Sequence, residues 1–428
     1  MSKFAAKDYA LGIQHLLAMF GATVLVPLMT GLSPSVALLC AGLGTLAFHL
    51  CTKCMVPVFL GSSFAFIPAL CTVINGEAVN IPYAQGGVIV AGLVYFVFAL
   101  LALVAGPNFI KKLFPAVVTG PVIIIIGLSL TGAAIKDALN CWDGVFNLHT
   151  LINASIALFT FAIMAIGMQR KKGLWKLIPI LVAIIAGYGL CVILHFTTKD
   201  IIDMNFSAIA NAPWVNIPYK TPGFVTLPKF SLSAILAIAP VALVTFMEHL
   251  GDITTNGAVV GKDFFKNPGL HRTLLGDGLA TAIAGFLGGP SNTTYSENTG
   301  VLATTGNYNP AILRLAAVFA IIMGLIGKFG AFLQTIPVPV KGGVELMLFG
   351  MIASIGIRTI VEAKLDMTAN RNLCVMAGTL CTGLGLVILG GIPLTFGSVT
   401  VNLSALFVAT IVGVVLNLVL PGNKLEKK

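Results

Sequence analysis

Four acidic side chains lie inside long apolar stretches of this chain: Glu248, Asp252, Glu297 and Glu345. Most of the other 11 of its 15 acidic residues lie in polar connections. Because a carboxylate at the centre of a membrane-spanning helix costs ~2.5–3.5 kcal/mol, each of the four is a candidate functional residue. Glu248 and Asp252 are four residues apart and therefore share one face of a helix.

A buried carboxyl group can couple a proton to a neutral ligand. Burial favours the protonated form, which presents an O–H donor beside a C=O acceptor. That edge complements a lactam, in which an N–H group lies next to a carbonyl, whereas an ionised carboxylate can only accept. Protonation therefore changes which edge of a heterocycle fits.

Structural explanations stand beside this functional one. A buried acid can cap a half-helix or satisfy buried amides, and Glu345 has Lys341 one turn before it, so a local ion pair would explain it. Asp277, between two glycines near the start of an apolar stretch, is interpreted as a helix-start or turn residue.

The composition gives the class of protein that must position these acids. Of 428 residues, 57% are hydrophobic and 9% are charged, and the mean hydropathy is +0.99. A soluble domain carries about 25% charged residues, so a water-soluble protein is excluded. Long unbroken apolar runs exclude a β-barrel, and abundant Leu, Ile, Val and Phe exclude a disordered chain. The sequence predicts an all-α polytopic membrane protein.

The apolar runs divide the chain into fourteen predicted transmembrane spans. They centre on residues 9–29, 35–52, 55–73, 85–105, 114–135, 151–168, 174–196, 231–252, 274–288, 293–304, 311–330, 336–357, 372–389 and 400–420.

The positive charges predict the orientation of these spans. An even number of spans puts both termini on one side, and a cytoplasmic placement assigns most of the 25 Lys and Arg residues to inside connections. The net charge of +10 is then a matter of topology and not of nucleic-acid binding. Cys51 and Cys54 form a CxxC pair with no second pair nearby, so we expect no metal site.

The two halves of the chain repeat each other. Gln14-His15 matches Glu248-His249 at an offset of 234, and FPAVVTGPVIIIIG (114–127) matches IPVPVKGGVELMLF (336–349) at an offset of 222. Seven spans per half is an odd number, so the second half enters from the opposite face. The sequence predicts two inverted 7-span repeats, which are typical of secondary transporters.

Two spans at corresponding places in the halves are unusually polar or broken. Residues 55–73 contain two prolines and a Gly-Ser-Ser segment, and the segment GGPSNTTYSENTGVLATTG (288–306) is rich in Gly, Pro, Thr and Asn. Each is expected to hold a short extended segment followed by a half-helix, whose N–H groups face a substrate at the bilayer midplane.

Several motifs in order resemble the nucleobase–ascorbate transporter family, also called nucleobase/cation symporter-2, and its bacterial uracil permease branch in particular. They are Gln14-His15, GSSFAF (61–66), MEHLGD (247–252) and NTTYSENTGVLATTG (292–306). The resemblance covers nearly the whole chain.

The resemblance implies a core domain of spans 1–4 and 8–11 and a gate domain of spans 5–7 and 12–14. On this chain the core comprises residues 1–110 and 231–330, and the gate comprises residues 111–230 and 331–428. A homodimer through the gate domains is implied as well.

The resemblance also implies roles for individual residues. Uracil would lie between two short strands, held by the carboxylates of Glu248 and Glu297 and by the backbone amides of Phe64 and Ser296, with Tyr295 beside them.

Other positions carry proton-coupling, gate-side or supporting roles. Asp252, together with Glu248 and Glu297, would carry the coupling proton. Glu345 and Phe349 occupy possible gate-side positions, where this chain departs from the uracil branch. The implied supporting residues are Gln14, His15 and Asn298.

The sequence is therefore interpreted as a proton-coupled uracil symporter of the bacterial cytoplasmic membrane. We expect no enzyme activity, no cofactor other than the proton, and no partner beyond the lipid bilayer, the nucleobase and a second copy. The alternatives are a xanthine or urate permease of the same family and an anion transporter of related fold. A channel or an intramembrane enzyme is less favoured.

Overall fold

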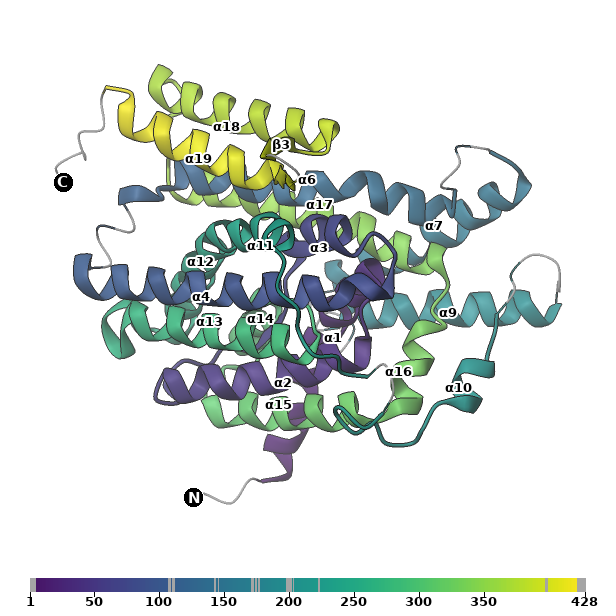
Figure 1. Cartoon of the computed structure of the whole chain (residues 1–428). Helices are drawn as coiled ribbons and strands as arrows, with labels where there is room; N and C mark the ends of the chain where they lie inside the picture. Colours follow the sequence, from purple (N-terminus) through teal and green to yellow (C-terminus); the bar gives the residue numbers. More distant parts are fainter. Residues whose placement is uncertain are drawn as a thin grey trace.

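The computed structural model describes residues 5–421, apart from residues 107–108, 110–111, 142–143, 145, 171–172, 174, 176–177, 198–201, 203, 222–223 and 397–398. Residues 1–4 and 422–428, whose cytoplasmic placement the sequence predicts, therefore lie outside the described part. Figure 1 shows a mostly helical molecule with long helices running alongside one another.

Nine helical segments in the described residues are long and apolar enough to cross a membrane. They establish a polytopic helical membrane protein. They contain α1 (Ala6–Thr30), α2 (Pro34–Cys51), α4 (Ile81–Ala105) after η2 (Ala78–Asn80), α6 (Ala116–Leu139), α7 (Leu148–Gln169), α9 (Pro179–Thr197), α11 (Leu232–Ile238) with η3 (Ala239–Val241) and α12 (Ala242–Val260), α17 (Val338–Glu362), and α18 (Asn370–Leu389).

The remaining helices include α13 (Leu270–Leu287), which is as long as α2 but less apolar. The others are shorter: η1 (Phe64–Phe66), α3 (Ile67–Ile74), α10 (Ser207–Asn211), η4 (Phe265–Gly269), α14 (Ser296–Thr305), α15 (Pro310–Leu325), α16 (Gly327–Gln334) and α19 (Ala405–Val419).

Two short strands meet in the interior of the molecule. Strands β1 (Leu60–Ser62) and β2 (Asn292–Thr294) pair antiparallel, with Gly61 opposite Thr293. Both strands are fully buried, which is where irregular backbone is tolerated inside a membrane. The extended segments expected in the two interrupted spans are confirmed, and each is followed by a short helix: η1 with α3, and α14.

Gly61 lets this strand pair lie close to its neighbours. A Cβ atom at this position would lie 2.5 Å from Oγ1 of Thr23 and from the ring of Tyr295. Real Cβ atoms do not approach other atoms so closely, so a residue without a side chain is required here.

Close helix packing organises two groups of helices. In Figure 1, α15, α2, α13 and α4 lie side by side, and α6 and α17 run together below α18 and α19. Glycines make these contacts possible: Gly42 faces the backbone of Ala317, and Gly92 faces the backbone of Gly278.

The contact between α6 and α17 has an internal symmetry. Gly120 packs against Ile360, and Gly342 packs against Ala138. Adding 222 to the first residue of one contact gives a residue of the other in both cases: 120 becomes 342, and 138 becomes 360. The offset read from the sequence thus maps one helix contact onto the other.

The prediction was wrong at the start of the last span, residues 400–420. Strand β4 (Val399–Leu403) pairs there with β3 (Ile392–Phe396), so the helix begins only at Ala405. In β4 apolar and polar residues alternate strictly, and in β3 Ile, Leu and Phe occupy every second position, a period-two pattern that favours strand over helix.

Candidate functional site

A cavity of about 350 Å³ lies between the paired-strand region and the helices α6 and α17. One wall consists of Phe64 from η1, of Glu248 and Asp252 from α12, and of Ser296 and Thr299 from α14. Two of the carboxyl groups predicted to carry the chemistry, those of Glu248 and Asp252, therefore share a cavity with the ends of two short helices.

The opposite wall of the cavity is apolar. Ile123 and Ile126 come from α6, and Ile352 and Ile355 come from α17. Farther along α17 the cavity reaches an exposed ion pair, in which Nε of Arg358 lies 2.6 Å from Oε1 of Glu362. This charged end is called the mouth of the cavity below.

Asp252 is held by two hydroxyl groups. Oγ1 of Thr294 donates to Oδ2 at 2.6 Å, and Oγ of Ser296 donates to Oδ1 at 2.5 Å. Both donors come from the segment where β2 ends and α14 begins. Asp252 is therefore positioned by a strand end and a helix start that lie 42 and 44 residues later in the chain.

Glu248 and Glu297 lie close enough to Asp252 to interact with it electrostatically. Glu248 lines the cavity one turn before Asp252. Glu297 lies in the first turn of α14 beside its own backbone N–H, and it is not one of the residues that line the cavity. The three acids converge, but only two of them line the cavity wall.

Tyr295 is part of the framework of the site. Its hydroxyl donates to the carbonyl oxygen of Ser62 at 2.8 Å and accepts from Oγ1 of Thr23 at 3.2 Å. Its backbone N–H donates to the carbonyl oxygen of Phe59 at 3.0 Å. Tyr295 is buried and ties β1 to α1, so its hydroxyl is occupied within the protein and does not face the cavity.

Phe64 and Phe349 form an aromatic pair at the end of the cavity that lies away from Arg358 and Glu362. Their ring centroids lie 5.9 Å apart at an interplanar angle of 79°. Phe64 lines the cavity, and Phe349 is fully buried behind it. Phe349 thus acts on the cavity through the ring of Phe64.

Glu345 lies away from the cavity. It is fully buried on α17 and is not among the residues that line the cavity wall. Among the described residues, no ion pair joins Glu345 to Lys341, so the local pair considered from the sequence is not formed.

The supporting residues connect α1 to α14. Nδ2 of Asn298 donates to the carbonyl oxygen of His15 at 2.9 Å and lies 3.2 Å from Nδ1 of its ring. Both side chains are buried. Gln14 is half-buried and does not line the cavity.

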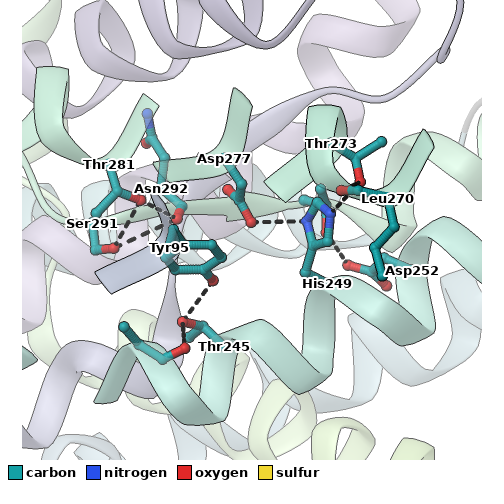
Figure 2. A network of polar contacts seen from close by, with 12 residues as sticks. Tyr95, Thr245, His249, Asp252, Leu270, Thr273, Asp277, Thr281, Ser291 and Asn292 are labelled. Carbon is teal, nitrogen blue, oxygen red and sulfur yellow. Dashed lines mark hydrogen bonds and ion pairs between the residues drawn. The ribbon is translucent and has the colours of Figure 1, made fainter. Parts of the chain in front are cut away.

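Sequence reasoning missed a buried polar network behind Asp252 (Figure 2). Nδ1 of His249 lies 2.9 Å from Oδ2 of Asp277, and Nε2 of His249 lies 3.0 Å from Oγ1 of Thr273. His249 also interacts electrostatically with Asp252. The interpretation of Asp277 as a helix-start residue was wrong, because it lies in the middle of α13 and is fully buried.

Two signals in the sequence could have found this network. Asp277 is an acid within an apolar stretch, and glycines flank it. Gly278 allows α13 to approach the backbone of Gly92 and the side chain of Tyr95, and the close helix contact encloses the acid.

A metal centre finds no support in the described part of the chain. No group of three or more His, Cys, Asp or Glu side chains is placed there to hold a metal ion. Cys51 and Cys54 are free thiols.

Comparisons with known proteins find relatives of this chain by sequence and proteins of similar fold. A sequence model of the permease family matches residues 6–392. A probable uracil permease of Pasteurella multocida is 43% identical over 98% of this chain and 95% of its own length. The uracil permease of Bacillus caldolyticus is 44% identical, with 96% of this chain and 92% of the relative covered.

A solved structure shares the fold at low identity. The murine Solute Carrier 26 family member A9 anion transporter in the inward-facing state has a TM-score of 0.70 and 11% identity, covering 98% of this chain and 68% of that chain. At that identity the similarity concerns the fold alone.

Proposed function

Because this chain belongs to the permease family, we propose that it is a symporter that imports uracil together with protons across the bacterial cytoplasmic membrane. Its relatives with 43% and 44% identity are named uracil permeases. The observation that carries the proposal is the cavity in which Glu248 and Asp252 face the start of two short helices beside a strand pair.

Uracil suits the chemistry of this cavity. Its ring presents N–H groups next to carbonyl groups, and the carboxylate of Glu248 accepts from the N–H groups. The first backbone amides of η1 and α14, at Phe64 and Ser296, have no partner within their helices and donate to the carbonyl groups. The ring of Phe64 covers one face of the base, and Glu297 supports the site from the first turn of α14.

Asp252 is the proposed proton carrier. It lines the cavity, and its two hydroxyl donors hold it toward the segment that binds the base. Behind it, His249 and Asp277 form a second polar layer that is sealed from water. A proton bound at Asp252 removes the repulsion between its carboxylate and that of Glu248, so Glu248 can stay ionised and accept from the base. Proton binding at Asp252 and base binding at Glu248 therefore favour each other.

The proposed architecture is fourteen spans in two inverted repeats, with both termini in the cytoplasm. The symmetric contacts of Gly120 with Ile360 and of Gly342 with Ala138 support the repeat. The core comprises residues 1–110 and 231–330, the gate comprises residues 111–230 and 331–428, and two copies pair through their gates. In this orientation the mouth at Arg358 opens to the cytoplasm, and the cavity lies between core and gate.

Ligand binding to the purified chain tests the substrate. Uracil, xanthine, urate and bicarbonate are compared for their ability to raise the melting temperature, since a ligand that binds the folded state stabilises it. Of these four ligands, only uracil should raise the melting temperature of the wild type and of the exposed-acid control Glu77→Gln. Uracil should leave the melting temperature of Glu248→Gln unchanged. Stabilisation by xanthine or urate instead would identify a purine permease, and stabilisation by bicarbonate alone would identify an anion transporter.

Uptake into proteoliposomes tests the coupling. An inward proton gradient should drive uracil accumulation, and a protonophore should abolish it. Accumulation that persists at full rate after the gradient is dissipated would refute proton coupling while leaving uracil as the substrate.

A further inference from the structure

A second pair of buried acids lies outside the cavity, between α6 and α17. Glu345 interacts electrostatically with Asp137, and the backbone of Asp137 packs against Gly342. Glu345 is fully buried and Asp137 is 8% exposed. The two carboxyl groups lie within hydrogen-bonding reach of each other, and the carboxyl oxygens of Glu345 have no other hydrogen-bond partner within the described chain.

The charges around this pair do not balance when both acids are ionised. The titratable groups that face it in the described residues are Lys341 from α17 and Cys71 from α3. Lys341 supplies one positive charge, but it forms no ion pair with either acid among the described contacts. Two adjacent buried carboxylates disfavour each other, and a single bound proton makes the group of two acids and one lysine neutral.

The pair lies at the end of the molecule opposite to the mouth. Glu345 precedes Phe349 on α17, whereas Arg358 at the mouth follows it. At this end α6 and α17 pack on α1 and α3 through apolar side chains. They include Leu25, Val26, Ile67, Leu130, Ala134 and Leu348. The acids stay buried as long as this contact, called the closed end below, holds.

We infer that Asp137 and Glu345 form a second proton-binding site, which holds one proton while the closed end is packed and releases it when the closed end separates. Separation admits water, and water stabilises the ionised carboxylates. The proton exchanges with the solvent at this end and does not reach the cavity. The assignment of the two ends to the two sides of the membrane rests on the proposed transporter function. In that transporter the site makes the opening of the closed end depend on pH, and it does not change the number of protons transported with each base.

A buried reporter cysteine measures the opening directly. Ala134→Cys places a thiol in the apolar contact, where Ala134 is fully buried, and the exposed Cys374 on α18, away from the acid pair, serves as an internal reference. Purified protein is treated with a maleimide at pH 6 and at pH 8.5, and labelling of each peptide is quantified by mass spectrometry. The ratio of the two labelling rates cancels the general effect of pH on thiol reactivity.

The ratio should rise at least ~5-fold from pH 6 to pH 8.5 in the Ala134→Cys protein, a change that corresponds to about 1 kcal/mol. It should stay constant when Glu345→Gln or Asp137→Asn is added, because a neutral amide cannot release a proton. The exposed acid variant Glu77→Gln should keep the full change. Both amide variants are measured, so that if one of them misfolds the other still tests the inference.

The inference would be overturned if the labelling ratio changed with pH in both amide variants as much as it does in the Ala134→Cys protein with its acids intact. A response to Na⁺ in place of choline at constant pH, absent from the amide variants, would overturn it in favour of a metal cation. The labelling needs no substrate. A protein that fails to bind uracil but shows this response would therefore refute the proposed function alone, and the reverse result would refute the second proton site alone.

Discussion

The carboxylate of Asp277 lies 2.9 Å from Nδ1 of His249, and both side chains are fully buried. The two residues come from neighbouring helices, α13 and α12, and the imidazole has Thr273 on its other side (Figure 2). Asp277 contacts His249, and His249 interacts electrostatically with Asp252 in the cavity wall, so Asp277 acts on the cavity through His249. This arrangement fixes the face of α12 that the cavity acids share.

Asp277→Asn should destabilise the protein by ~1–3 kcal/mol, because it replaces a charge-assisted contact to His249 with a weaker one. The expected result is a melting temperature lower by several degrees in detergent. Glu77→Gln, a substitution in the exposed connection before η2, is the control for the change from acid to amide and should leave the melting temperature unchanged. Equal melting temperatures for the two variants would show that the contact contributes nothing.

Ser296→Ala should weaken uracil binding about tenfold, since it removes one of the two hydroxyl donors to Asp252 and keeps the backbone amide. Equilibrium binding of labelled uracil measures the change. Ser155→Ala removes a hydroxyl that bonds the Leu151 carbonyl on the exposed side of α7, and it should bind as the wild type does. Wild-type affinity in Ser296→Ala would mean that Asp252 needs no positioning.

Gly61→Ala should abolish uracil binding, because a Cβ atom there would collide with Thr23 and Tyr295 and push β1 away from β2. Thermal stabilisation by uracil is the measurement. Gly132→Ala on α6 is the control, since nothing lies within 4 Å of the added methyl group. If Gly61→Ala responds to uracil as Gly132→Ala does, the strand pair tolerates the displacement and does not set the binding geometry.

Phe349→Leu should lower the affinity for uracil a few-fold and destabilise the fold by ~0.5–1.5 kcal/mol, the value of an aromatic pair beyond its buried area. The reason is that the ring of Phe64 loses the edge-to-face partner that holds it against the cavity. Phe159→Leu on the exposed surface of α7 tests the same chemical change elsewhere. Identical binding by both variants would exclude a role for the pair.

Much of the architecture could be predicted from the sequence. Long apolar runs must be buried in lipid or protein whatever their neighbours are, so the membrane class follows from composition. Glycine, proline and polar side chains weaken a helix locally, so the two interrupted spans were visible as well. The β3–β4 hairpin was missed because most of β4 was read as the start of the last helical span and β3 as the connection before it, although β4 alternates apolar and polar residues.

The roles of the individual acids were predicted less well. Glu248, Asp252, Glu297, Glu345 and Asp277 are all acids in or beside apolar stretches, and nothing local distinguishes their surroundings. Asp252 faces the cavity because β2 and α14 supply its hydroxyl donors from 42 and 44 residues away. Glu345 faces Asp137 because Gly342 lets α6 and α17 approach at that turn.

The sequence by itself therefore determined that this protein spans a membrane, which segments break their helices, and which buried charges need an explanation. These properties follow from the free energy of each side chain in an apolar environment, which depends little on distant residues. Only the tertiary structure decided which acids share the cavity, which one pairs with His249 and which pair lies at the closed end. The direction of a side chain has meaning only when the helix packed against that face is known, and that helix comes from another part of the chain.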